Sequence, residues 1–202
     1  MTDLLSALLG QDKNTFQELE QRRRELARDL AAASYLPGEY VLSGGAPSSY
    51  YFHPSLFMTR PTVLRRLVSV LATSIGPDVD RLAGSEPGSL PIVVGLALET
   101  GLPFVSLRSE TRPGNRLPVP YGELHPGEKV LVIEDVVTSG RRAIAAADSI
   151  EAAGGHIEGL LCVVDRQEGA EKAIASRNWR FESLFTTREL VSFSATTVPT
   201  RS

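Results

Sequence analysis

Several residue types that mark particular classes of protein are scarce in this sequence. Its 202 residues include one cysteine, Cys162, which excludes an internal disulfide framework. Cys162 lies in the apolar run LLCVV, a context that predicts a buried thiol and not a nucleophile. The formal net charge of −3 at pH 7 gives no general attraction to nucleic acid or to an anionic membrane surface.

Long apolar runs and the common nucleotide-binding motifs are also missing. The longest apolar run, LPIVVGLAL, ends at Glu99 and is too short to cross a membrane. The first residues have no basic region and no convincing cleavage site of a secretory signal. Neither G-x-x-x-x-G-K-[ST] nor G-x-G-x-x-G occurs, so the main support for a P-loop or Rossmann protein is absent. We therefore expect a cytoplasmic protein that binds neither nucleic acid nor membrane.

From Pro61 onward, apolar strands alternate with helices. Helices are predicted at 61–75, 90–101, 141–153 and about 170–176, strands at 78–84, 103–108, 129–135, 156–165 and 180–185, and a loop at 109–127. The strands are continuous apolar runs, as expected when helices cover both faces of a sheet. This pattern predicts an α/β fold with a doubly wound, mostly parallel sheet.

The first part of the chain has a different character. A helix is predicted from Thr15, because a threonine cap with Glu18 three residues later precedes good helix formers. A region rich in Gly, Pro and Ser follows, with strand candidates on either side of a Gly-Gly turn. These elements are a helix at 15–33 and short strands at 40–42 and 50–52. We expect residues 1–58 to form a small helix-plus-hairpin hood and residues 59–202 to form the α/β core.

The most informative stretch is VLVIEDVVTSGRR, residues 130–142. Ligands bind at the carboxyl ends of the strands in an open parallel sheet, and this strand ends in Glu134 and Asp135. The segment Thr138–Arg142 then supplies two hydroxyls, a glycine and two arginines at the start of a helix. Backbone N–H groups without intrahelical partners and the helix dipole attract phosphate at such a position.

The two acids need a ligand of another kind, because a carboxylate repels phosphate. Vicinal sugar hydroxyls or a divalent cation would suit them. A ligand with a phosphate and a nearby diol is a phosphosugar, and a ribose 5-phosphate fits this spacing. The structural alternative is an ordinary capped helix that follows an acidic strand end.

The segment Glu134–Gly140 resembles the phosphoribosyl diphosphate (PRPP) signature of type I phosphoribosyltransferases. The resemblance extends to the orotate phosphoribosyltransferase branch over roughly residues 38 to 170. It is carried, in this order, by the stretches YVLSGGAPSSYYFHPSLF, LAGSEPGSLPIVVGLALETGLPFVSLRSET and VVDRQEGA.

The resemblance implies a role for each matching residue. The two acids would hold the ribose hydroxyls of PRPP, the following loop would hold its 5-phosphate, and an arginine would face the carboxylate of orotate. The implied PRPP-binding residues are Glu134, Asp135, Val136, Val137, Thr138, Ser139, Gly140, Arg141 and Arg142. The implied base-binding residues are Tyr50, Tyr51, Phe52, Thr138 and Arg166, and the implied catalytic residues are Arg108, Arg112 and Asp135.

The sequence departs from the family where cations are expected. Family members carry Arg-Lys-Glu-x-Lys-x-His/Tyr-Gly in a mobile loop, and here Ser109 and Arg112 stand at the lysine positions. The departures elsewhere are Gly114 at the His/Tyr position, Ser43 and Gly88 where some members have lysine, and Arg141-Arg142 after the motif glycine. Loss of one cation that stabilises the negative charge developing on the leaving group typically raises the activation barrier by about 2–4 kcal/mol.

The resemblance implies Mg²⁺-dependent transfer of ribose 5-phosphate from PRPP to orotate, which gives orotidine 5′-phosphate and pyrophosphate in pyrimidine nucleotide biosynthesis. The Mg²⁺ would be carried by PRPP without protein ligands, and the protein would be a homodimer. Two alternatives remain open: a PRPP- or nucleotide-binding or regulatory protein with weakened or lost catalysis, and a transferase for another base. The stretch DRQEG favours orotate, whereas the missing lysines favour a binding protein.

Overall fold

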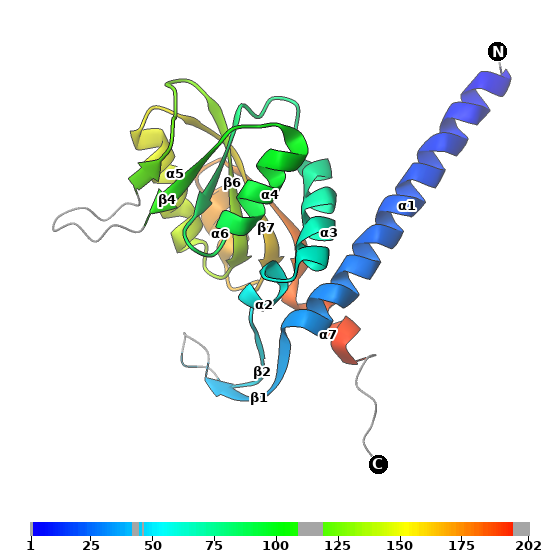
Figure 1. Ribbon diagram of the computed structural model, residues 1–202, viewed down its shortest axis with the longest axis horizontal. Helices are drawn as coiled ribbons and strands as arrows, with labels where there is room; N and C mark the ends of the chain where they lie inside the picture. The colour runs from blue at the N-terminus through cyan, green and yellow to red at the C-terminus, as the bar shows by residue number, and fades with distance from the viewer. Residues whose placement is uncertain (1, 42–44, 46, 109–118, 196–202) are drawn as a thin grey trace.

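The computed structural model describes residues 2–41, 45, 47–108 and 119–195, and Figure 1 shows a central sheet with a separate hairpin. The strands are β1 Tyr35–Val41, β2 Pro47–Phe52, β3 Arg81–Ser85, β4 Phe104–Arg108, β5 Val119–Tyr121, β6 Lys129–Val137, β7 His156–Asp165 and β8 Arg180–Thr186. The helices are α1 Thr2–Ser34, α2 Ser55–Met58, α3 Pro61–Leu71, the 3-10 helix η1 Ala72–Ser74, α4 Leu90–Thr100, α5 Arg141–Ala152, α6 Ala170–Ala175 and α7 Thr187–Ala195.

The central sheet has the strand order β5-β4-β3-β6-β7-β8. Strands β4, β3, β6, β7 and β8 pair in parallel with their neighbours, whereas β5 pairs antiparallel with β4. From β3 the chain winds outward to β4, and from β6 it winds the other way to β7 and β8. The predicted doubly wound α/β fold is confirmed, and the winding reverses between β3 and β6, where such sheets bind ligands.

Two helix layers cover the sheet. On one face, Leu26 of α1, Leu67 of α3 and Leu96 of α4 are buried in a single cluster with Ile133 of β6. On the other face, α5 and α6 pack against a second cluster of strand residues that includes Cys162. Cys162 is therefore buried as predicted, and this burial raises the pKa of its thiol well above the usual value.

Strand β5 was not predicted, because it lies in the segment that the sequence marks as a loop. It is only three residues long, and Pro120 offers no N–H to a neighbouring strand. It forms at the edge of the sheet, where Tyr121 pairs with Ser106 of β4. Tertiary placement beside β4 therefore decides this strand, and residues 109–118 of the predicted loop lie outside the described residues.

Helix α1 begins at Thr2, so the predicted start at Thr15 is wrong. The preceding residues, TDLLSALLGQDKN, contain no proline and are rich in leucine, so they can continue a helix. Figure 1 shows the first half of α1 projecting away from the body, while its second half lies against the core. No helix in the described part of the chain is long and apolar enough to cross a membrane.

The predicted hairpin is confirmed by the pairing of β1 with β2, and both strands begin before the predicted starts at 40 and 50. Residue 42 of the first predicted strand and Gly44 of the predicted turn lie outside the described residues. The rings of Tyr35 and Tyr50 stack across it with centroids 5.3 Å apart, and those of Tyr40 and Tyr51 lie 5.6 Å apart. Such aromatic pairs stabilise a two-stranded sheet that would be marginal by itself. The domain boundary between residues 58 and 59 stays a prediction.

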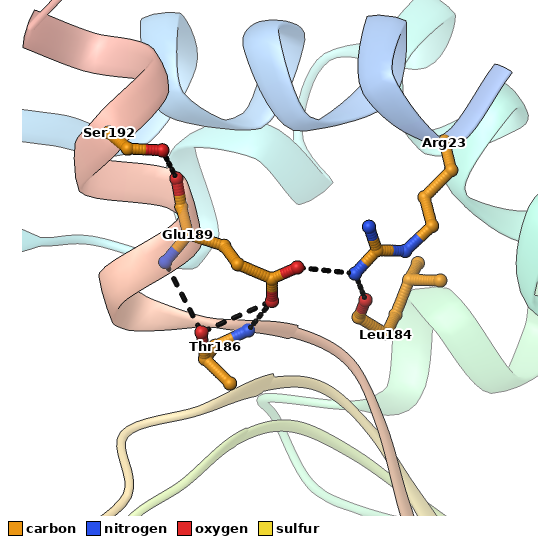
Figure 2. A network of polar contacts seen from close by, with 5 residues as sticks. All are labelled: Arg23, Leu184, Thr186, Glu189 and Ser192. Atoms are coloured by element: carbon orange, nitrogen blue, oxygen red, sulfur yellow. Dashed lines mark hydrogen bonds and ion pairs between the residues drawn. The ribbon is translucent and has the colours of Figure 1, made fainter. Parts of the chain in front are cut away.

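Helix α7, which the sequence did not predict, is fixed at its start by a capping box, shown in Figure 2. Thr186 Oγ1 accepts a hydrogen bond from the Glu189 N–H at 3.2 Å, and the Thr186 N–H donates to Glu189 Oε2 at 2.8 Å. Arg23 of α1 donates to Glu189 Oε1 and to the Leu184 carbonyl, each at 2.8 Å. Burial raises the pKa of Glu189, but the hydrogen bonds from Arg23 and Thr186 outweigh this effect, so the pKa lies below its ordinary value. The network joins the first helix to the last.

We expect Thr186→Ala to lower the free energy of unfolding by about 1 kcal/mol, the usual cost of a lost N-terminal cap. Urea denaturation measures this difference. Thr62→Ala, at an exposed position in the first turn of α3, is the control and should change the unfolding free energy by much less. Equal losses in the two variants would contradict a stabilising capping box.

Candidate active site

The acid pair of β6 lies at the point where the winding of the sheet reverses. Glu134 and Asp135 are 4% and 8% exposed, which is rare for carboxylates without a cationic partner. Ser85, the last residue of β3, donates a hydrogen bond from Oγ to Glu134 Oε1 at 2.7 Å. Asp135 Oδ1 accepts from the Val136 N–H at 2.8 Å. Each carboxylate thus has a hydrogen-bond donor but no ion pair among the described residues.

Burial dominates the electrostatics of this pair. Desolvation raises the pKa of Glu134 to about 7, with a further increase from Asp135, although Ser85 and Arg142 act in the opposite direction. Desolvation also raises the pKa of Asp135. A group that donates hydrogen bonds to these acids would therefore be bound strongly, because it would relieve the cost of their charge.

A purely structural acid at the other end of the sheet behaves differently. Glu128 accepts two hydrogen bonds from Arg81, from Nε at 2.7 Å and from Nη2 at 2.8 Å. This pairing lowers the pKa of Glu128 to about 2. The chain can therefore neutralise a carboxylate with arginine, and it does not do so at β6. Perturbed acids of this kind gather at functional sites.

The turn after β6 forms a cavity of about 370 Å³. Its walls include Glu134 and the whole segment Thr138–Arg142. Gly140 has φ of +79°, a left-handed conformation, and a Cβ there would lie 3.3 Å from the Ala170 Cα. Only glycine fits both constraints comfortably, so the turn can lead directly into α5. The segment predicted to be an anion cradle thus lines a concave site with an acid at its side.

Asp135 points elsewhere, because neighbouring residues on a strand face opposite sides of the sheet. It is not among the described residues that line this cavity. Its carboxylate adjoins Gly88 instead, where a Cβ would lie 3.0 Å from Asp135 Oδ2. Any side chain at position 88 would therefore begin against this acid. The closeness of the Asp135 carboxylate therefore explains why glycine fits at position 88, where some family members have lysine.

The candidate base-binding residues are only partly gathered. Tyr50 and Arg166 line one cavity of about 370 Å³, and Arg166 Nε lies 3.1 Å from Glu168 Oε1. Tyr51 contacts Tyr40 and the edge of His53 within the hairpin. Thr138 lines the other cavity, next to Glu134, and Phe52 is described by its backbone alone.

Of the two candidate catalytic arginines, only Arg108 lies among the described residues. Arg108, the last residue of β4, lies 3.4 Å from Glu86 Oε2 and stacks over the ring of Tyr121 at 3.9 Å. Arg112 lies outside the described residues. The described residues contain no group of three or more His, Cys, Asp or Glu that could hold a metal ion.

Reasoning from the sequence missed Ser85 and Glu86, which adjoin the predicted site. Ser85 binds Glu134, and Glu86 binds both Arg108 and the Ser106 hydroxyl, the latter at 2.6 Å. The sequence could have indicated both residues, because they follow the predicted strand at 78–84 and ligands bind at the carboxyl ends of parallel strands. Only the strand order shows that β3 is the neighbour of β6.

Known structures share this fold. No family model matches the chain. The chain is similar to the crystal structure of orotate phosphoribosyltransferase from Aeropyrum pernix, with a TM-score of 0.76, 26% identity and coverage of 86% of this chain and 99% of that one. It is also similar to orotate phosphoribosyltransferase from Mycobacterium tuberculosis H37Rv, with a TM-score of 0.74, 25% identity and coverage of 84% and 98%. The fold is that of the type I phosphoribosyltransferases.

Sequence similarity narrows the class further. The chain is 33% identical over 176 residues to the orotate phosphoribosyltransferase of Thermococcus gammatolerans, and the match covers 86% of this chain and 93% of that protein. The chain belongs to the orotate phosphoribosyltransferase family. The family resemblance drawn from the sequence is thereby confirmed.

We expect the stability of the protein to fall as Glu134 ionises. Its pKa is about 7 in the folded state against an ordinary 4.5, so stability is fully present below pH 4.5 and lost as the pH rises through about 7. Relative to Glu134→Gln, the wild type should lose about 3 kcal/mol across this range, at about 1.4 kcal/mol per pKa unit. Denaturant titrations at several pH values measure the difference.

The exposed Glu171 provides the control substitution, Glu171→Gln, which should leave the pH dependence of the wild type unchanged. If the unfolding free energies of the wild type and Glu134→Gln ran parallel from pH 4.5 to above 7, Glu134 would not be the titrating group.

Proposed function

We propose that this protein transfers ribose 5-phosphate from PRPP to orotate, which gives orotidine 5′-phosphate and pyrophosphate for pyrimidine nucleotide synthesis. Membership of the orotate phosphoribosyltransferase family supports this activity. The observation that carries it is the cavity in which Glu134 lies beside the cradle Thr138–Arg142, with Asp135 next to it in the strand. A phosphosugar presents hydroxyls to acids and a phosphate to N–H groups and arginines, as this arrangement requires.

In the proposed reaction, the bond from C1 of the ribose to the pyrophosphate oxygen breaks and a bond from C1 to N1 of orotate forms. The electron pair of the broken bond leaves with pyrophosphate, and orotate gives up its N1 proton. No protein nucleophile takes part, so rate comes from positioning and electrostatics. Glu134 and Asp135 would hold the ribose hydroxyls from the two sides of β6, Glu134 from the cavity and Asp135 from beside Gly88, and the ionised acids would stabilise positive charge on the ribose ring.

We propose that Mg²⁺ enters with PRPP on its pyrophosphate. Hard oxygen ligands suit this ion, which usually keeps several waters and binds through few carboxylates. The ion would then need no ligand from the protein, and Glu134 and Asp135 would stay with the ribose hydroxyls. Removal of Mg²⁺ with EDTA should abolish turnover, and added Mg²⁺ should restore it.

One feature favours a second candidate, a PRPP-binding protein with weak or no catalysis. The lysines of the chain are Lys13, Lys129 and Lys172, and none falls in the segment 108–116 where the family has two. Arg112 could bind pyrophosphate, but arginine and lysine are not equivalent at such sites. The sequence-based proposal that Arg108 and Arg112 contact the leaving group belongs to the first candidate.

The test of function is incubation with orotate, PRPP and Mg²⁺, followed by the loss of orotate absorbance. We expect turnover by the wild type, and we expect Asp135→Asn/Thr138→Ala to weaken PRPP binding roughly ten- to a hundredfold, the loss expected for charge-assisted hydrogen bonds. Calorimetric titration with PRPP measures this binding. PRPP binding without any orotate turnover would favour the second candidate.

A matched control is Asp78→Asn/Thr73→Ala, which makes the same chemical changes at exposed positions. Both positions precede β3 and therefore lie near the amino ends of the strands, whereas the candidate site lies at their carboxyl ends. This control should bind PRPP as the wild type does. Equal PRPP affinity in all three proteins would contradict the assignment of the site to Asp135 and Thr138.

We also propose that the protein is a homodimer in the cytoplasm. The family's mobile loop usually completes a neighbouring site, and Val41, 77% exposed in the hairpin, suits a subunit contact. Sedimentation at micromolar concentration should show a species of about twice 21.8 kDa. A single species near 21.8 kDa would contradict the dimer. The cytoplasmic location rests on the sequence alone.

A further inference from the structure

The cavity between the hairpin and α7 holds a second arginine that no resemblance assigned. Arg166 follows β7 and Tyr50 comes from β2, and Arg188 of α7 lines the same space of about 370 Å³. We propose that Arg188 is a further specificity-determining residue, which binds the carboxylate of the base together with Arg166. This inference rests on the proposed function, in which the base is orotate.

An acid within the cavity offsets the charge of Arg166. Glu168 also lines it and lies 3.1 Å from Arg166, so the charge of Arg166 is already compensated within the cavity. Arg166 and Glu168 together have no net charge and would give an anionic base little preference over a neutral one. Arg188 has no ion pair among the described residues. It therefore supplies the excess positive charge that a carboxylate would recognise.

The backbone that carries the exposed Arg188 side chain is fixed by its neighbours. It lies between Thr187 and Glu189 in the first turn of α7, and Glu189 is bound by both Thr186 and Arg23 (Figure 2). The backbone at Arg188 is thus fixed by the capping box and by an ion pair to α1. A guanidinium on a fixed helical turn loses less freedom on binding than one on a loop.

The helix start itself favours an anion. The first N–H groups of a helix have no intrahelical acceptor, and the dipole is positive there. Thr187 lines the cavity at this turn, and its Oγ1 is buried without a hydrogen-bond partner among the described residues. A buried hydroxyl without a partner is costly, and a shift of this side chain toward a ligand oxygen in the cavity would relieve that cost. The start of helix α7 and the Thr187 hydroxyl therefore both favour an anionic ligand beside Arg188.

We expect Arg188→Ala to raise the KM for orotate roughly ten- to a hundredfold, the loss of one hydrogen-bonded charge pair. The KM for PRPP and kcat should stay close to those of the wild type, because the interaction is with the base alone. Arg188→Lys keeps the charge without the planar fork and should recover part of the affinity. Steady-state kinetics with each substrate varied in turn measures these constants.

Arg65→Ala, at an exposed position on α3, is the matched control and should leave both KM values unchanged. Thermal unfolding of every variant separates binding from folding. A structural role for Arg188 would instead lower the melting temperature and change both KM values together, and that result would overturn the inference.

The remaining outcomes separate this inference from the proposed function. Wild-type turnover of orotate with an unchanged KM for orotate in Arg188→Ala overturns the role of Arg188 and leaves the proposed function intact. Absence of orotate turnover in the wild type contradicts both.

Discussion

The parallel pairing of β3, β6, β7 and β8 brings the candidate functional side chains that these strands carry or precede to one end of the central sheet. Ser85 ends β3, Glu134 and Asp135 lie near the end of β6, and Arg166 and Thr187 directly follow β7 and β8. These residues are far apart in the sequence and lie at the same end of the sheet only because parallel strands end together. The reversal of winding between β3 and β6 leaves room there for a ligand.

This arrangement places two carboxylates where their charge is costly. Burial is tolerated at Glu134 because Ser85 donates a hydrogen bond, yet its pKa remains near 7. The paired Glu128 at the other end has a pKa of about 2. The ion pair stabilises Glu128 at the amino end of β6, whereas Glu134 near the carboxyl end of the same strand has no ion pair among the described residues and remains available to a ligand. Stability is commonly lost where a site is prepared in this way.

The N-terminal helix takes part in the same arrangement through α7. Arg23 of α1 binds Glu189, and Glu189 closes the capping box that begins α7. Leu26 and Leu30 of α1 are buried in the cluster that also contains Phe185 of β8. The first and last helices therefore support the wall of the cavity that holds Tyr50 and Arg166. A helix that projects from the body at one end is at its other end part of the core.

The sequence by itself determined the fold class and the acid pair with its phosphate cradle, because these depend on local patterns. Apolar runs alternating with helices predict a doubly wound sheet, and EDVVTSG is continuous in the chain. Only the tertiary structure decided β5, α7 and the placement of Arg188 in the same cavity as Arg166, because these depend on strand order and packing between distant segments. The start of α1 was misjudged because Thr15 and Glu18 form a local capping pattern, whereas continued helix formation through 2–14 overrides it.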